Sequence, residues 1–157
     1  MAGETLRAVL ELQHREIDAR IETYIAQPAG GVNRTASLNQ AIAGLRRHIY
    51  LEERFLFPAL RDAGLIAPVF VMIREHGKMW QTLDRLEPEV EDGAADATAL
   101  ELCRELVGQL QAHNPKEEQI LYPQADTALC ASTAAELRAF LSCGQLPDGW
   151  TCEAAQS

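Results

Sequence analysis

One phrase occurs twice in this chain of 157 residues and restricts its fold more than any other feature. Residues 48–58 read HIYLEERFLFP and residues 113–123 read HNPKEEQILYP, so a histidine, two glutamates, a leucine, an aromatic residue and a proline occupy matched positions. In a helix, residues four apart lie on one face, about 5 to 6 Å apart at Cβ. Each phrase therefore presents an imidazole and a carboxylate in the same direction, which is half of a metal site.

The remaining histidines fit the same arrangement. His14 lies 34 residues before His48, and His76 lies 37 residues before His113. The chain has four histidines, so all of them belong to one pattern, in which a lone histidine is followed by a histidine and a glutamate four residues apart.

Apolar residues recur at helical spacing along most of the chain, and no segment shows the alternation of a strand. This pattern predicts an all-α fold. Ser37 and Gln40 have the spacing of a capping box, which marks the start of the second helix. The predicted helices cover approximately residues 5–27, 37–55, 67–86, 96–121 and 133–143.

Prolines and glycines mark the expected breaks between these helices. Pro28 and a pair of glycines end the first helix, Pro58 should kink the second or end it early, and Pro88 should begin a loop that continues through Gly93. Pro115 falls inside the fourth helix, where it should bend the chain beside the histidine and glutamate of the second phrase.

Four amphipathic helices joined by short loops predict an up-down-up-down four-helix bundle with a short extra C-terminal helix. We expect residues 1–143 to form this domain and residues 144–157 to form a C-terminal tail. His14 and His48 lie at similar distances from the first predicted loop, and His76 and His113 at comparable distances from the third. All four imidazoles can therefore meet at one level of the bundle.

Composition narrows the location and the partners. The net charge of -9 argues against nucleic acid and anionic membrane as partners, because both attract clustered lysine and arginine. No apolar run is long enough to span a membrane and the N-terminus is too charged for a signal peptide, so we expect a cytoplasmic protein. The four cysteines form no C-x-x-C pair, which predicts reduced thiols.

Four imidazoles and two glutamates inside an apolar bundle would carry a large desolvation penalty unless cations lie between them. The alternative is a buried polar cluster held by hydrogen bonds alone. Six ligands without a thiolate are too many for one tetrahedral zinc and suit two ions bridged by carboxylates, with iron first and manganese or zinc next. A ferritin-like site is disfavoured, because its carboxylate-first order occurs only once, at Glu11 and His14.

These residues resemble the hemerythrin-like proteins with the HHE cation-binding domain, over approximately residues 5–125. The resemblance implies a four-helix bundle around a non-haem di-iron centre with an oxo or hydroxo bridge. It also implies two kinds of protein ligand: terminal histidines at His14, His48, His76 and His113, and bridging carboxylates at Glu52 and Glu117.

The chain departs from the oxygen-carrying hemerythrins at two positions. Trp80 stands where they have a further histidine, and Glu117 replaces an aspartate that follows at a longer step. The pattern is similar to the branch with four histidines and two glutamates. That branch includes iron-sulfur repair proteins, iron-sensing domains and proteins directed at peroxide or nitric oxide.

The resemblance implies a protein that binds O2, NO or peroxide, either as a redox sensor or as a modest peroxide- or NO-consuming enzyme. The alternative is a non-catalytic iron-handling module for sensing, storage or iron-sulfur repair. Around the ligands, Glu53 and Glu118 should point about 100° away from the metal and so support the ligands or face solvent. Asp18 is a weaker candidate ligand, and Phe57 and Tyr122 are interpreted as core packing.

Overall fold

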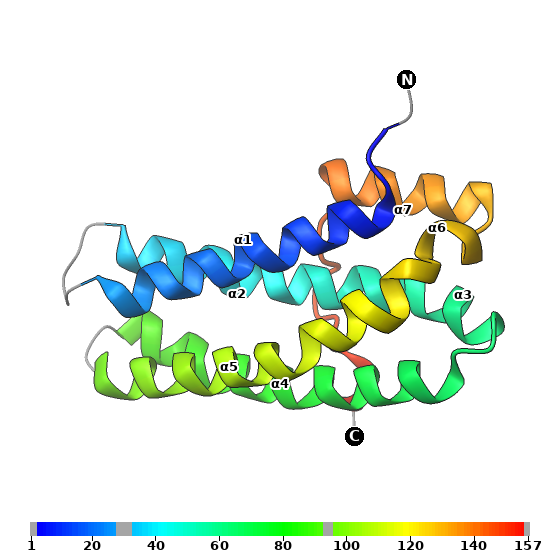
Figure 1. Cartoon of the computed structure of the whole chain (residues 1–157). Helices are drawn as coiled ribbons and strands as arrows, with labels where there is room; N and C mark the ends of the chain where they lie inside the picture. The colour runs from blue at the N-terminus through cyan, green and yellow to red at the C-terminus, as the bar shows by residue number, and fades with distance from the viewer. Residues whose placement is uncertain (1–2, 28–32, 93–95, 156–157) are drawn as a thin grey trace.

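The computed structural model describes residues 3–27, 33–92 and 96–155. Its four long helices lie side by side (Figure 1): α1 (Leu6–Ala26), α2 (Arg34–Leu51), α4 (Ile66–Asp92) and α5 (Asp96–Lys116). Successive long helices run in opposite directions, with α1 packed along α2 and α4 along α5. The described residues contain no strand. The predicted all-α bundle is confirmed.

The first helix begins and ends where the sequence predicts. The Thr5 side chain caps α1 by accepting a hydrogen bond from the Ala8 amide, and Gln27 follows its last residue. The second helix begins earlier than predicted, at Arg34, so the capping-box prediction at Ser37 is wrong. The Ser37 hydroxyl instead donates to the Arg20 carbonyl of α1, which ties the two helices together. The predicted break from Pro28 to Gly31 lies outside the described residues.

The later helices also differ from the predicted boundaries. α4 continues through Pro88 as far as Asp92, while the predicted loop residue Gly93 lies outside the described residues. Pro115 does lie inside α5, close to its end. The short C-terminal helix, α7 (Ala131–Cys143), begins two residues before Thr133.

Each repeated phrase contains a short π-helix: η1 (Glu52–Leu56) and η2 (Glu117–Leu121). The Phe57 amide donates to the carbonyl of Glu52, five residues back, and the Tyr122 amide donates to Glu117 in the same way. The proline that ends each phrase has no N–H, and its ring would clash with a carbonyl four residues back. The chain continues as α3 (Phe57–Asp62) and η3 (Tyr122–Gln124), so Pro58 does not end the helical run.

The apolar core is divided into two clusters along the bundle. The loop-end cluster lies toward the first and third interhelical connections and includes Ile17, Leu45, Ile49 and Met79. The cap-end cluster lies toward α3, α6 (Ala125–Ala128) and α7 and includes Leu10, Leu51, Ile73 and Leu121. Along the chain each histidine comes between residues of the two clusters, so the histidines form a polar layer inside an apolar bundle.

The described part of the C-terminal tail packs against the bundle (Figure 1). Its last element, the short 3-10 helix η4 (Glu153–Ala155), lies on α4, and Cys152 before it is buried. No two cysteines among the described residues are joined by a disulfide bond. Among the described residues, no helix is sufficiently long and apolar to cross a membrane.

Candidate metal centre

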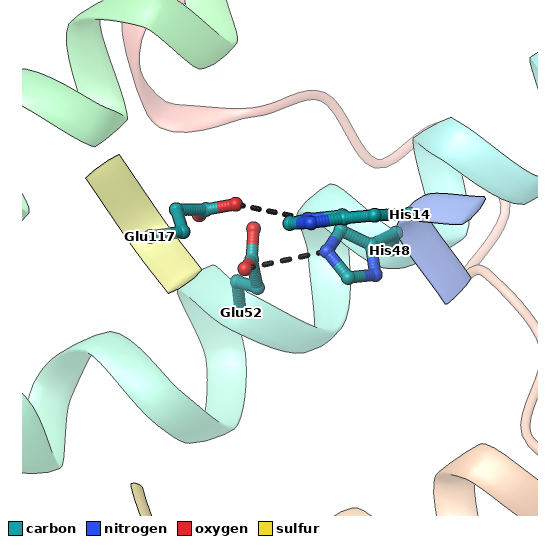
Figure 2. A group of neighbouring side chains, drawn as sticks. All are labelled: His14, His48, Glu52 and Glu117. Atoms are coloured by element: carbon teal, nitrogen blue, oxygen red, sulfur yellow. Dashed lines mark ion pairs between the residues drawn. The ribbon is translucent and has the colours of Figure 1, made fainter. Parts of the chain in front are cut away.

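All six predicted ligands meet in the polar layer between the two apolar clusters. They come from six helical elements: His14 from α1, His48 from α2, Glu52 from η1, His76 from α4, His113 from α5 and Glu117 from η2. None is more than 3% exposed. Figure 2 shows His14 and His48 facing the two glutamates, with ion pairs from His14 to Glu117 and from His48 to Glu52.

The ligand atoms form two groups that share both glutamates. His14 and His48 belong to one group and His76 and His113 to the other, and within each group the atoms lie no more than 4.8 Å apart. We call these groups the first position and the second position. Each position therefore offers two imidazole nitrogens and oxygens from two carboxylates, and no thiolate.

Both carboxylates reach across from one position to the other. Glu52 places Oε2 3.3 Å from His48 Nε2 and Oε1 3.2 Å from His76 Nε2. Glu117 places Oε1 3.2 Å from Nε2 of both His14 and His113. Two carboxylates that each face both positions have the arrangement needed to bridge two cations.

The second glutamate of each phrase orients a histidine of the opposite half of the bundle. Glu118 Oε2 lies 2.7 Å from His14 Nδ1, and Glu53 Oε2 lies 2.7 Å from His76 Nδ1. An ionised carboxylate only accepts hydrogen bonds, so each Nδ1 carries a proton and the Nε2 lone pair of a neutral ring faces the cluster. Glu53 and Glu118 therefore hold two of the predicted ligands in place, which is one of the two roles that the sequence left open for them.

His48 and His113 are oriented by the residues that directly precede His14 and His76 in the chain. Gln13 Oε1 lies 2.6 Å from His48 Nδ1, and Glu75 Oε1 lies 2.9 Å from His113 Nδ1. Glu75 also accepts a hydrogen bond from Lys116. The hydrogen bonds from His113 and Lys116 lower the pKa of Glu75 to about 2. All four imidazoles are thus held by an oxygen acceptor on the side away from the cluster.

In the absence of cations, the buried imidazoles and carboxylates stabilise each other's charged forms. Burial by itself lowers the pKa of His14, but the carboxylates of Glu117, Glu52 and Glu118 outweigh burial and raise this pKa to about 9. The imidazoles likewise outweigh burial for Glu117 and hold the pKa of its carboxyl well below the usual range. Positive charge is therefore strongly favoured between these carboxylates.

Three buried polar atoms of the cluster indicate that it is better suited to binding cations than to forming hydrogen bonds among its own side chains. Glu52 Oε1, His76 Nε2 and Glu117 Oε2 make no well-directed hydrogen bond within the described part of the chain, although Glu52 Oε1 and His76 Nε2 lie only 3.2 Å apart. Buried polar atoms are normally paired, and leaving one unpaired costs about 1 to 3 kcal/mol. Imidazole and carboxylate are suitable ligands for iron, manganese and zinc. The residues present therefore fit a pair of divalent or trivalent metal ions.

Tyr122 is a residue of the site that the sequence interpretation missed, because its ring was assigned to core packing. Its ring does pack at 5.3 Å from that of His14, but its hydroxyl lies within hydrogen-bond distance of the ligands. Tyr122 follows Glu117 by five residues, which is the spacing of a π-helical hydrogen bond, and its amide makes that bond to Glu117. The mismatch between Phe57 and Tyr122 in the repeated phrase was the available signal.

Two other residues considered from the sequence lie outside both positions. Asp18 is half-buried, and burial raises the pKa of its carboxyl, but the metal-ligand groups found among the described residues do not include it. Trp80 belongs to the loop-end cluster, where it packs edge-on against Trp150 and lies under Arg46. These contacts show that Trp80 is a core residue.

The C-terminal tail reaches the metal centre through Glu53. The Glu153 amide donates to Glu53 Oε1 at 2.9 Å, while Oε2 of the same carboxylate accepts from His76. Gly77 allows the tail to approach, because a Cβ at this position would lie 2.6 Å from Ala154 Cβ. The tail therefore helps to hold the carboxylate that orients His76.

Gly77→Ala should consequently destabilise the protein by about 1 to 3 kcal/mol, since η4 must move away from α4. Gly108→Ala is the matched control, because this glycine also lies in a long helix and a Cβ there meets nothing within 4 Å. The control should stabilise by up to about 1 kcal/mol through helix propensity. Urea unfolding of both variants measures the difference, and equal stabilities would mean that the close approach of the tail has no energetic consequence.

Comparisons with known proteins agree with this geometry. A family model described as the hemerythrin HHE cation binding domain matches residues 5–125. The crystal structure of a hemerythrin HHE cation binding domain-containing protein from Mycobacterium kansasii is similar to this chain, with a TM-score of 0.68, 19% sequence identity and 89% of each chain covered. At this identity the likeness shows a common fold. A search of curated protein sequences finds no significant match.

Proposed function

The chain belongs to the hemerythrin family of HHE cation-binding domains, and from this premise we propose that it is a non-haem di-iron protein that reacts with small oxidants. The proposed iron ligands are His14, His48, His76, His113, Glu52 and Glu117. In this proposal the histidines are terminal ligands, the two glutamates bridge the ions, and an oxo or hydroxo group completes the bridge.

One observation carries the proposal: the two positions share both buried carboxylates while three of the buried ligand atoms have no hydrogen-bond partner within the described residues. A polar cluster held by hydrogen bonds alone would be expected to pair these atoms. Two cations would satisfy them and offset the burial of two negative charges. Iron is preferred because the ligands are imidazole and carboxylate without thiolate, and the family match supports a cation site.

When bound, a pair of iron ions supplies Lewis-acid and redox chemistry at coordination positions that the protein leaves free. The chain's own contribution is to hold the ligands in place. Oxygen acceptors fix all four imidazoles, and the apolar clusters on both sides of the layer restrict access by water and large molecules. We therefore propose O2, NO or peroxide as the small ligand, with a role as a redox sensor or as a modest peroxide- or NO-consuming enzyme.

The second candidate is a non-catalytic module that senses, stores or delivers iron, including iron for iron-sulfur repair. The near-complete burial of all six ligands favours it, because an enclosed centre retains iron well and limits turnover. Both candidates use the same ligands and differ in whether the centre reacts repeatedly.

Stopped-flow spectroscopy separates the two candidates. The iron-loaded protein is mixed with a large excess of hydrogen peroxide, and peroxide consumption is followed together with the iron absorption. We expect many molecules of peroxide to be consumed per chain. Zinc-loaded protein is the control, because it keeps the fold and removes the redox-active metal. A single reaction per centre, followed by no further consumption, would assign the protein to iron handling.

A further inference from the structure

The two metal positions are related by the repeated phrase but are not equivalent. Phe57 and Tyr122 hold the same place in the two phrases, each five residues after its bridging glutamate. The ring of Phe57 stacks on His76 at 5.4 Å with an interplanar angle of 20°, and the ring of Tyr122 lies 5.3 Å from that of His14 at 31°. The two aromatic side chains thus cover corresponding histidines, but only Tyr122 carries a hydroxyl.

That hydroxyl lies among the ligand atoms of the first position. Its oxygen is 2.9 Å from His14 Nε2 and 3.0 Å from His48 Nε2. It donates to Glu52 Oε2 at 2.6 Å and lies 3.2 Å from Glu117 Oε1. These four residues are the full ligand group of the first position, so an ion held by that group is within reach of the phenol oxygen.

We propose that Tyr122 is a seventh protein ligand, which binds the ion held by His14 and His48 through its phenolate oxygen. This inference rests on the proposed di-iron function. In the chain without metal the Tyr122 hydroxyl donates a hydrogen bond to Glu52. When the oxygen binds the ion, the hydroxyl proton is released to solvent. Ferric iron accepts tyrosinate as a ligand in other protein settings, and the residue is fully buried here, so no alternative hydration competes for the oxygen.

Among the described residues, the second position has no corresponding donor, because Phe57 offers only its ring to His76. The imidazole nitrogen His76 Nε2 of this position is buried and makes no hydrogen bond within the described residues, whereas Nε2 of both His14 and His48 lies within hydrogen-bond distance of the Tyr122 hydroxyl. An additional protein ligand therefore occupies a coordination place at the first ion but not at the second. The external small ligand consequently binds the ion held by His76 and His113.

The experiment uses full-length protein loaded anaerobically with ferrous iron and then oxidised with O2. Tyrosinate bound to ferric iron absorbs in the visible region, and excitation there enhances the ring vibrations of the bound tyrosine in the resonance Raman spectrum. Wild type should show both signals, and Tyr122→Phe should lose both while it retains its iron. Tyr50→Phe is the matched control, because Tyr50 packs against Phe55, Phe140 and Trp150, away from the ligands, and should leave both signals unchanged.

Wild type that binds its iron but has no tyrosinate signal overturns the inference and leaves the di-iron function standing. The same conclusion follows if Tyr122→Phe keeps the signal or if Tyr50→Phe removes it. Protein that binds no iron contradicts the di-iron function itself. Should Tyr122→Phe fold poorly, the Raman spectrum of wild type still decides whether a tyrosinate is bound.

Azide tests which ion takes the external ligand. Added to the oxidised protein, azide should create its own charge-transfer absorption while the tyrosinate vibrations persist, because the two ligands bind different ions. Azide that abolishes the tyrosinate vibrations would show that it replaces Tyr122 on the same ion. That result would overturn the assignment of the external ligand to the second position.

Discussion

Glu117→Ala should reduce the iron content from about two ions per chain to less than one, the largest effect expected from any single substitution. Glu117 faces both positions, with Oε1 3.2 Å from the Nε2 atoms of His14 and His113, so its loss removes a carboxylate ligand from each ion at once. It also leaves one carboxylate among four imidazoles. Iron content is measured by elemental analysis after the protein has been loaded and unbound metal removed. As an independent check, oxidised wild type should show oxo-to-iron charge-transfer absorption in the near ultraviolet.

Glu118→Ala is the matched control, because it removes the adjacent carboxylate and leaves all six ligands. It withdraws the acceptor of His14 Nδ1, which should weaken metal binding by roughly 10- to 100-fold without abolishing it. At saturating iron this variant should still hold about two ions per chain. Equal losses in Glu117→Ala and Glu118→Ala would contradict the distinction between bridging and supporting carboxylates. One zinc per chain in wild type would contradict the di-iron proposal.

Removal of the metal should lower the melting temperature by roughly 10 °C near neutral pH. A ligand present at 100 to 1,000 times its dissociation constant stabilises a fold by about 2.7 to 4.1 kcal/mol, and each kcal/mol shifts a chain of this size by about 2 to 4 °C. Calorimetry of chelator-treated and reloaded protein measures the shift. An unchanged melting temperature after verified removal would mean that the cluster is not a buried metal site.

The difference between the two forms should grow with pH. Without metal, His14 has its pKa raised from 6.5 to about 9, so its stabilising contribution is complete below pH 6.5 and is lost as pH rises to about 9. The pKa values of His76 and His113 are raised as well, with the same consequence. In the loaded form the neutral imidazoles bind metal, so this loss does not occur.

At acid pH the sign is reversed for the carboxylates. The pKa of Glu117 is lowered, so its contribution is present above its ordinary value of 4.5 and is lost as pH falls below it. The metal-free protein should therefore be most stable between about pH 5 and 6.5. A gap between loaded and metal-free protein that stays constant from pH 6 to 9 would contradict this account.

The bundle and the ligands could be predicted from the sequence because both depend on short-range spacing. Apolar residues three and four apart define the faces of the long helices, and His48 and Glu52 share a face for the same reason. The equal distances of His14 and His48 from one interhelical connection placed them at one level, and the structure brings them together with ring centroids 4.8 Å apart.

The parts that could not be predicted depend on a change of helix type or on contacts between distant residues. A regular α-helix would turn Tyr122 away from the face of Glu117, and the π-helix restores it by widening one turn. The sequence feature that could have indicated the π-helix is the proline that follows the aromatic residue in each phrase. The tail has no helical or strand periodicity, and its contact with Glu53 is made by the backbone amide of Glu153, which any residue type could supply.

The contact between the tail and Glu53 implies an order in which the two metal positions are completed during synthesis. A chain grows from its N-terminus, so the helices of the bundle are made before the tail. Gln13 and Glu118, which orient the histidines of the first position, have both been made before Glu153. The carboxylate that orients His76 gains its last hydrogen bond only after residue 153 has been added. Iron that reaches the chain early should therefore be retained first by His14 and His48.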